Sequence, residues 1–401
     1  MSPLASTLLI LGLLSGLGVI SFGLYYQFGR QTSLFTKLTK NDLTEEWTIQ
    51  RSDSTFMPLV TDINGQLIHV WFSNDGQTIH LESTASDCLI SFVDHKRVKD
   101  PLQVVGSAIG NAVVALVEED VTNRQTNFRI YSFHERYQCS LSIIKDIALD
   151  EVVLNKTVFL VAQHYTFDVF LKDDRYCGPG RICRRSYEGH TGKAVSLSND
   201  TQLTVASDVW SISSVAKNVP SSGFIYTQIF PNGRSILIQK LDSDLKSLAS
   251  SKWSGIDHYS TSAGRISLCK EETNQTLICS LVDADLKDLV DESIVVPVDE
   301  DRRSLQLHNL PKGGVIVLWI GKAEHQVLYD QDTLVVRMRI VDAEGKVSDV
   351  IELLDHNVCA ENEIRSLETS DREGLCFRVS CHSGVSVKCI VRNKDRLFNW
   401  V

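Results

Sequence analysis

Cysteines are the residues with the clearest chemistry in this 401-residue chain, which contains ten of them. Cys269 and Cys279 flank a polar turn, and so do Cys376 and Cys389. These spacings are typical of opposed positions on adjacent antiparallel strands, where Cβ atoms lie about 4.5–5.5 Å apart, near the separation that a disulfide needs. We therefore expect each pair to form a disulfide across a β-hairpin.

A third candidate disulfide joins Cys177 and Cys183, which bracket a tight Gly-Pro-Gly loop. The connectivity of the remaining four cysteines stays open, and the pairing that we favour is Cys88 with Cys139 and Cys359 with Cys381. The alternative is that the cysteines are buried free thiols in a cytosolic protein. No CxxC pair occurs and no histidine has ligand spacing to a cysteine pair, so we expect neither a metal site nor a cofactor.

Other signatures of catalysis or nucleic-acid binding are missing from the sequence. It contains no GxSxG, HExxH or P-loop motif, and no GxGxxG that opens a helix. The net charge of −10 provides no basic surface for phosphate, which disfavours nucleic acid as a partner. The basic pairs Arg184-Arg185 and Arg302-Arg303 could bind an anion or be cleaved by a protease, but solvated loops are the favoured interpretation.

Three Asn-x-Ser/Thr sequons are candidates for glycosylation, at Asn155, Asn199 and Asn274. Chance alone gives about that many in a chain of this length, so their number decides nothing. Asn274 falls at the tip of a predicted hairpin, where a glycan can be accommodated.

The N-terminal segment, residues 1–30, contains an uncharged apolar run over residues 8–26. As a helix this run would span ~28 Å, close to the hydrocarbon thickness of a bilayer. An uncleaved membrane anchor is favoured over a cleaved signal peptide and over a buried core helix. Arg30, Lys37 and Lys40 follow the run and by themselves would place the C-terminal part in the cytosol. The cysteines instead favour the secretory pathway, with the protein lumenal, extracellular or, after cleavage, secreted.

Beyond a linker at residues 31–45, the chain repeats a Gly–strand–turn–strand unit and shows no long 3.6-residue apolar period. The clearest match aligns residues 223–248 with residues 264–289, at an offset of 41 positions. Gly223 corresponds to Gly264, and the Asp-x-Asp-Leu-Lys run at Asp242 corresponds to the one at Asp283. Turn residues at a fixed offset between β-rich runs predict a repeated hairpin.

The repeat predicts an all-β domain over residues 46–401, a β-propeller of seven or six four-stranded blades. Radial stacking buries both apolar faces of each small sheet, which none can bury alone. Residues 46–49 are expected to close the ring beside residues 397–400. A pair of β-sandwiches is the alternative fold. The expected units begin near Gly65, Gly110, Lys156, Gly223, Gly264, Gly314 and Gly374.

The first unit, residues 56–80, resembles the opening blade of sialidase-like propellers of the Asp-box type. Met57 stands where that family places its substrate-binding arginine, so the resemblance implies the propeller fold with a degenerate site. The residues that match the family pattern are Phe56, Pro58, Gly65, Ser73, Asp75, Gly76 and Thr78.

These features favour a binding or adhesion module that recognises an extracellular or lumenal protein or glycan through loops on one face. The alternatives are a sialidase-like glycoside hydrolase and a lumenal scaffold subunit of a membrane complex. The longest predicted loops are residues 172–220 and 321–333. Tyr and Arg are common interface anchors, so the binding candidates are Tyr176, Arg181, Arg184, Arg185 and Tyr187.

Overall fold

The computed structural model describes the backbone of strands between residues 43 and 392, and most side chains between residues 159 and 353. Side chains are not described at 160, 162–165, 171, 173–176, 189–192, 194, 196–202, 205–209, 216–222, 231–233, 262–263, 311–312 and 322–333. The apolar run at residues 8–26, two of the sequons (Asn155 and Asn199) and Tyr176 lie outside the described residues. Within them, no helix is long and apolar enough to cross a membrane.

In the part of the chain that the structure describes, twenty-eight strands form seven four-stranded antiparallel sheets, numbered here as blades 1 to 7. Blade 1 comprises β2 (Leu59–Thr61), β3 (Leu67–Phe72), β4 (Thr78–Ser83) and β5 (Leu89–Val93), and blade 2 comprises β6 (Arg97–Gly106), β7 (Asn111–Asp120), β8 (Gln125–His134) and β9 (Ser140–Leu149). Blade 3 comprises β10 (Val158–Ala162), β11 (Thr166–Lys172), β12 (Arg181–Glu188) and β13 (Gln202–Thr204), and blade 4 comprises β14 (Trp210–Ser214), β15 (Phe224–Ile229), β16 (Ser235–Leu241) and β17 (Ser247–Ser254). Blade 5 comprises β18 (His258–Ser262), β19 (Arg265–Thr273), β20 (Thr276–Asp283) and β21 (Ile294–Pro297), and blade 6 comprises β22 (Arg303–Asn309), β23 (Val315–Lys322), β24 (Leu334–Val341) and β25 (Ile351–Glu352). Blade 7 comprises β26 (Ile364–Ser366), β27 (Gly374–Cys381), β28 (Gly384–Arg392) and the N-terminal strand β1 (Leu43–Arg51).

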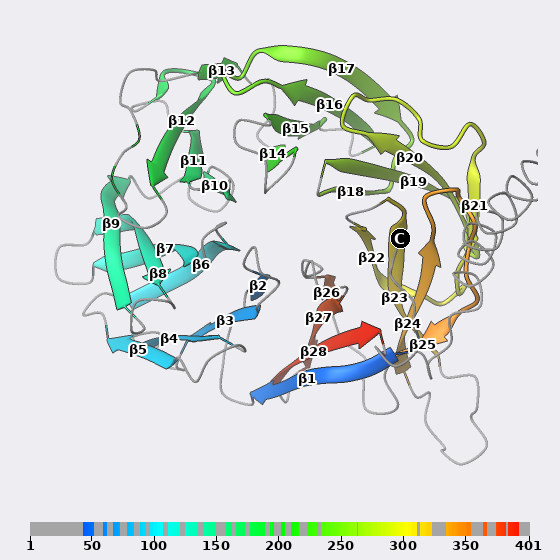
Figure 1. The fold of residues 1–401 in the computed structure, drawn as a ribbon, viewed down its shortest axis with the longest axis horizontal. Coiled ribbons are helices and arrows are strands. Elements are labelled where there is room, and N and C mark those ends of the chain that lie inside the picture. Colours follow the sequence, from blue (N-terminus) through cyan, green and yellow to red (C-terminus); the bar gives the residue numbers. More distant parts are fainter. Residues whose placement is uncertain are drawn as a thin grey trace, which may run out of the picture.

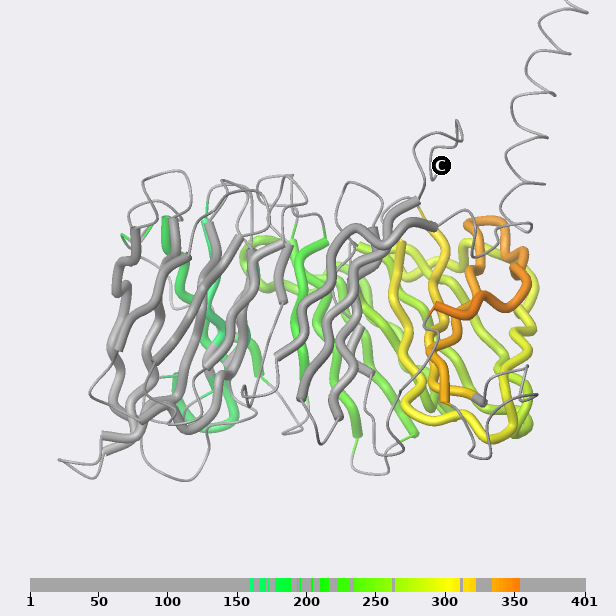
Figure 2. The backbone as a smooth tube through the Cα atoms, turned by 90° about the horizontal axis from the view of Figure 1, so that it is seen from below, coloured from blue at the N-terminus to red at the C-terminus, as the bar shows by residue number. Residues whose placement is uncertain are grey.

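The sheets surround a central axis, with the first strand of each blade innermost (Figure 1). Each of these strands contacts the next one along the chain, from β2 through β6, β10, β14, β18 and β22 to β26. Figure 2 shows the disc from the side, with the described strands running between its two faces. This is the predicted all-β propeller architecture, built from antiparallel four-stranded blades.

Blade 7 joins the two ends of the strand sequence, because β1 pairs antiparallel with β28. The register places Trp47 opposite Cys389, and Cys389 is also opposite Cys376 on β27. The expectation that residues 46–49 close the ring is therefore right. Its expected partner, residues 397–400, is wrong: the N-terminal strand pairs instead with Gly384–Arg392, and it begins at Leu43, within the expected linker.

The 41-residue repeat has the predicted structural meaning. Strands β15 and β16 of blade 4 correspond to β19 and β20 of blade 5. The unit expected at Lys156 is an exception, since β10, which follows it, is the first strand of its blade rather than the second. Residues 172–220 are not one long loop either, because they contain the outer strands β12 and β13 and the inner strand β14. The sequence shows no continuous apolar run at these strands, because they are rich in polar residues.

An aspartate organises the turn after the third strand in three successive blades. The Asp283 Oδ1 atom accepts hydrogen bonds from the backbone N–H groups of Asp285 at 2.8 Å and Lys287 at 2.9 Å. Asp242 and Asp342 accept two backbone hydrogen bonds in the same way. This is the local side chain-to-backbone bonding for which aspartate is favoured in turns. The repeated Asp-x-Asp/Glu-x-Lys run therefore encodes a turn.

Glycines at the start of the second strand permit a close approach of two chain segments. Gly223 has φ +86°, and a Cβ added there would lie 2.2 Å from the carbonyl oxygen of Leu241. In the same way, a Cβ added at Gly314 would lie 2.3 Å from the carbonyl oxygen of Val341. A Cβ at Gly264 would lie 2.2 Å from Val215 O, which belongs to the preceding blade region. The repeated glycine is thus required by contacts within and between blades.

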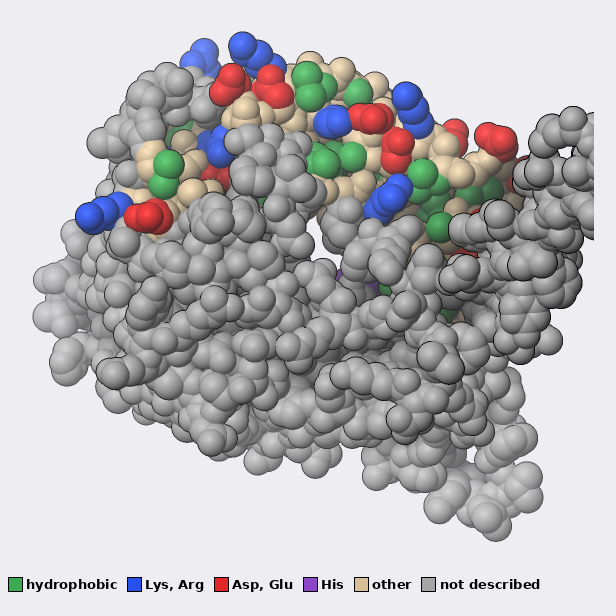
Figure 3. Space-filling model, viewed as in Figure 1, with side chains coloured by type: hydrophobic (Ala, Val, Ile, Leu, Met, Phe, Trp, Pro, Cys, Tyr) green, Lys and Arg blue, Asp and Glu red, His purple; other side chains and the backbone are tan. Residues whose placement is uncertain are grey.

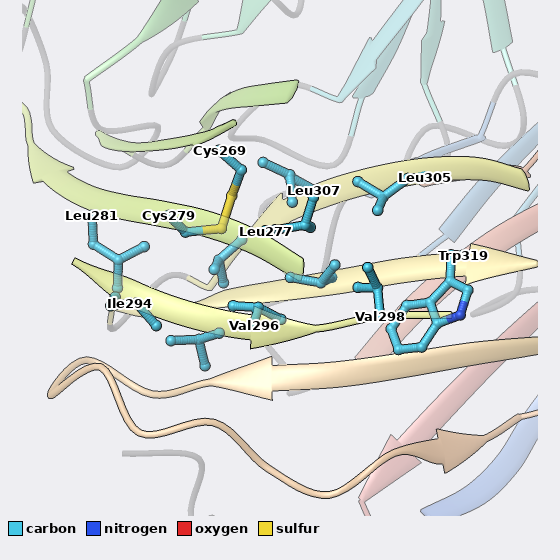
Figure 4. Packing of buried hydrophobic residues seen from close by; sticks show 13 residues of the cluster. Cys269, Leu277, Cys279, Leu281, Ile294, Val296, Val298, Leu305, Leu307 and Trp319 are labelled. Carbon is cyan, nitrogen blue, oxygen red and sulfur yellow. A yellow bond between two sulfur atoms is a disulfide. The ribbon is translucent and has the colours of Figure 1, made fainter. Parts of the chain in front are cut away.

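The core lies between the blades, where apolar residues from facing sheets interdigitate. One cluster combines blade 5 and blade 6 around the fully buried Trp319 and includes the Cys269–Cys279 disulfide (Figure 4). Leu318, Trp319 and Ile320 are successive and all buried, as predicted for a strand covered on both faces. Full burial of one such large apolar side chain contributes about 1.5–3 kcal/mol.

We expect Gly223→Ala to lower the free energy of unfolding by about 2–5 kcal/mol, because it combines a left-handed φ with displacement of the Leu241 carbonyl. Gly255→Ala is the matched control: Gly255 has φ +75°, but an added Cβ meets no atom within 4 Å. The free energy of unfolding of Gly255→Ala should fall by only about 1–2 kcal/mol. Urea unfolding of both variants measures the difference, and equal losses would contradict the close-approach explanation.

Candidate interaction face

Three segments on one face of the disc are tied together by hydrogen bonds from blade 5 and the connections on either side of it. They are the β17–β18 connection at residues 255–257, the β19–β20 tip at residues 270–276 and the β21–β22 connection at residues 298–302. In an up-and-down sheet, the turn from the second to the third strand and the link from the fourth strand to the next blade emerge at the same face. Hydrogen bonds between these segments confirm that they meet, and we name them the clamped face.

Arg302 is the centre of this arrangement. Its guanidinium donates to the Glu271 carboxylate, to the Asn274 carbonyl oxygen at the hairpin tip and, at 3.3 Å, to the Asp299 carbonyl oxygen. The Arg302 side chain is only 8% exposed. One cation therefore fixes the β19–β20 tip against the β21–β22 connection, through charge-assisted bonds that are stronger than neutral ones.

Glu271 extends the network toward the inner strand β18. The Nε2 atom of His258 lies 3.2 Å from the Glu271 carboxylate, and the Glu271 backbone N–H donates to Asp257 Oδ2 at 2.9 Å. The hydrogen bond from His258, aided by Arg302 and opposed by desolvation, holds the pKa of Glu271 below its usual value. The carboxylate therefore stays ionised near neutral pH and joins the two segments.

Further bonds restrain the outer part of the tip. Gln275 Nε2 donates to Glu300 Oε2 at 3.0 Å, and the Val298 N–H donates to the Gln275 carbonyl at 2.9 Å. At the base of the hairpin, the disulfide joins directly opposed Cys269 and Cys279. This is the pairing that the cysteine spacing predicts, and it anchors the tip covalently.

The charged side chains left in solvent on the clamped face are mostly acidic, and Lys270 is the exposed base of these segments. The exposed residues of these segments are Gly255, Asp257, Lys270, Glu271, Glu272, Thr273, Asn274, Gln275, Glu300 and Asp301. On the face seen in Figure 3, by contrast, basic and acidic side chains are interspersed over the described blades. The clamped face suits a specific polar contact better than non-specific attraction to a polyanion.

The predicted anchor Arg184 does not lie on a surface loop. It lies on β12, with Nε 3.0 Å from the fully buried Asp168 carboxylate of β11. Its guanidinium also donates to the Ser243 carbonyl and lies 4.8 Å from the Phe224 ring centre, both in blade 4. Arg184 thus joins blade 3 to blade 4 from a strand and not from the expected loop, and its role in binding stays a prediction.

The other predicted anchors share β12 and divide between interior and surface. Tyr187 is buried and stacks on Phe167 with ring centres 5.3 Å apart. Burial raises the pKa of Tyr187, against a smaller opposing effect of its hydrogen bond with Arg185. Arg185 is half-buried, and Arg181 is exposed beside the Cys177–Cys183 disulfide, which forms as expected. Arg181, Arg184, Arg185 and Tyr187 therefore cluster because they share strand β12, and not because they belong to a long loop.

Two carboxylates meet at Arg337, away from the inner strands. Arg337 contacts Asp299 at 2.9 Å and Glu352 at 2.6 Å, and Trp319 Nε1 donates to Asp299 at 2.9 Å. Burial favours a lower pKa for Arg337, but the two acidic partners raise it overall. Glu352 lies on β25, the outermost strand of blade 6, so this pair supports the packing of blade 6 and not a glycosidase pair at the channel mouth.

The residues of the clamped face were not identified from the sequence. Arg302 was interpreted as part of a solvated loop, because an arginine after an acidic run carries no local sign of its distant partners. Glu271 is 31 positions from Arg302, and the two meet only because consecutive blades stack. The one available signal was Asn274, whose hairpin tip was predicted and forms between the paired residues Thr273 and Thr276.

No protein-family model matches this sequence, and no curated protein is significantly similar to it. Among solved structures, the chain is similar to an acylaminoacyl peptidase from Pyrococcus horikoshii, with 10% identity and a TM-score of 0.45, over 86% of this chain and 50% of that one. It is also similar to the β-propeller domain of the Trilobed protease from Pyrococcus furiosus, with 9% identity and a TM-score of 0.43, over 83% and 93% of the chains. A DUF4623 family protein from Bacteroides eggerthii has 11% identity and a TM-score of 0.36, over 86% and 71%.

We expect Arg302→Ala to lower the free energy of unfolding by about 1–3 kcal/mol, because it leaves Glu271 and the Asn274 carbonyl without their shared donor. Hydrogen exchange at the amides of residues 271–276 should accelerate. Lys270→Ala, at an exposed position of the same hairpin, is the control and should change stability by about 0.5 kcal/mol or less. Unchanged exchange at the tip in Arg302→Ala would show that the clamp does not order it.

The stability that Glu271 provides should depend on pH. Its folded-state pKa is lowered, so its contribution is present above its unfolded pKa of about 4.3 and is lost as pH falls through the lower folded value. The difference in unfolding free energy between the wild type and Glu271→Gln should therefore shrink as the pH falls below about 5. Chemical denaturation between about pH 5 and 3 measures it. A difference that grows on acidification within this range would have the wrong sign for a lowered pKa.

Proposed function

We propose that this propeller is a binding module that recognises a protein or glycan partner through the clamped face, in an oxidising compartment. The observation that carries the proposal is the nearly buried Arg302, which fixes the β19–β20 tip against the β21–β22 connection, while the Glu271 backbone N–H joins the tip to the β17–β18 connection. Function in rigid scaffolds usually resides on such connections.

The energetic basis is preorganisation. Ordering a loop and its side chains on binding opposes association, at roughly 0.5–1.5 kcal/mol for each immobilised side chain. In the clamped face the tip is already held by Arg302, by the Gln275–Glu300 bond and by the disulfide. Exposed groups such as Lys270 and Glu272 therefore project from a backbone that needs little further ordering.

Two disulfides in the described part support the oxidising compartment, since cytosolic conditions keep most thiols reduced. We propose that residues 8–26 anchor the chain in a membrane, with the propeller lumenal or extracellular. In this arrangement the rigid disc presents one face to partners in the same compartment.

The two alternatives have less support. For a sialidase-like hydrolase, the described carboxylate pair at Arg337 is engaged in ion pairs and includes a residue of an outer strand. For a scaffold subunit, a large exposed apolar patch is expected. The exposed large apolar residues in the described part are four: Val195, Leu248, Leu289 and Val295.

Site-specific photo-crosslinking in the full chain tests the proposal. A photoreactive phenylalanine derivative replaces Glu272 on the clamped face, or Ser250 on the outer strand β17 as the matched exposed control. We expect a discrete adduct from position 272, little from position 250, and loss of the adduct when Arg302→Ala is added. Adducts that form equally at both positions, or that survive Arg302→Ala unchanged, would argue against recognition through this face.

A further inference from the structure

Asn274 is solvent-exposed at the β19–β20 tip of the clamped face. Asn274, Gln275 and Thr276 form an Asn-x-Thr sequon without proline, the acceptor sequence for N-glycosylation. The hairpin tip closes with Thr273 paired to Thr276, and the positions from Lys270 to Gln275 are solvent-exposed. A substituent on the Asn274 side chain would therefore extend into solvent.

The fold uses the backbone of Asn274 and leaves its side chain available. Arg302 binds the Asn274 carbonyl oxygen, and Gln275 and Thr273 make the other polar contacts of the tip. Within the described part of the chain, the side-chain amide of Asn274 has no hydrogen-bond partner. Modification of that amide would break no contact that holds the tip.

The same hairpin carries the Cys269–Cys279 disulfide, whose formation requires an oxidising compartment. The secretory pathway that supplies this compartment also attaches N-glycans. The disulfide and the sequon thus lie on one hairpin. The disulfide indicates the glycosylating compartment independently of the sequon.

We propose that Asn274 carries an N-linked glycan that borders the recognition surface. In the attachment step, Asn274 Nδ2 forms a bond to the anomeric carbon of an oligosaccharide donated by a polyprenyl diphosphate. The anomeric C–O bond to the diphosphate breaks, the lipid diphosphate leaves with the electron pair, and the amide proton is released. No oxidant or reductant is needed.

The glycan also defines which part of the clamped face a partner can approach, an extension that rests on the proposed function. Asn274 lies at the tip between the second and third strands, whereas Asp257 and His258 lead into the innermost strand β18. A bulky glycan at the tip shields the side toward the rim. The partner is then confined to the β19 side of the tip, which carries Glu271 and Glu272 and where Asp257 and His258 meet Glu271.

The experiment compares glycosylation of the full chain expressed in eukaryotic cells. Wild type, Asn274→Gln and Thr276→Val are analysed by mobility before and after glycosidase treatment, and by mass spectrometry of the peptide that contains Asn274. Both substitutions preserve the carbonyl bound by Arg302. A fourth variant, Ser250→Asn with Lys252→Thr, creates a control sequon on the exposed strand β17.

We expect each of the two sequon variants to lose one glycan step relative to wild type, and the control variant to gain one. Glycosidase should convert Asn274 of the wild type to aspartate. An unmodified Asn274 together with a modified control sequon would overturn the glycan and leave the compartment assignment intact. If neither site is modified, the compartment assignment fails together with the glycan.

Discussion

The structure depends on the burial of both faces of each small sheet by its neighbours. A four-stranded blade is too small to hide its apolar residues alone, and only the ring provides a second covering surface for each blade. The cluster around Trp319 and Cys279 combines residues of blades 5 and 6, and Arg184 joins blade 3 to blade 4 through Phe224 and Ser243. Pairing of β1 with β28 completes blade 7, so the first and last described strands stabilise the same sheet.

The same stacking creates the candidate recognition surface. Consecutive blades bring the β19–β20 tip beside the connection that leads into blade 6, which allows Arg302 to bind Glu271 and the Asn274 carbonyl. The disulfide at the base of that hairpin lies within the inter-blade core. The packing that stabilises the fold therefore also holds the exposed tip in place, because the disulfide connects the two. The candidate recognition surface needs no separate stabilising element.

Buried polar residues show how the propeller limits the cost of its interior charges. Asp168 is fully buried, but Arg184 and Ser186 contact its carboxylate. Arg337 is shared by Asp299 and Glu352, and Gly321 leaves the space that the Asp299 carboxylate occupies, 2.0 Å from where a Cβ would lie. Burial of unpaired charge is strongly unfavourable, so these sets act as units. Sequence patterns that suggest binding, such as the Tyr and Arg residues of β12, can therefore serve internal pairing.

Local sequence determined the features that depend on neighbours along the chain. The glycine at the start of the second strand in blades 4 to 6, the aspartate turns, the hairpin disulfides Cys177–Cys183 and Cys269–Cys279, and the tip at Asn274 all follow from short-range geometry. Tertiary structure decided which residues meet across blades. Arg184 is 59 positions from Ser243 and Arg302 is 31 from Glu271, separations at which no period or propensity specifies a partner. Only the radial packing of the blades fixes those distances, because it sets which edge of one sheet faces the next.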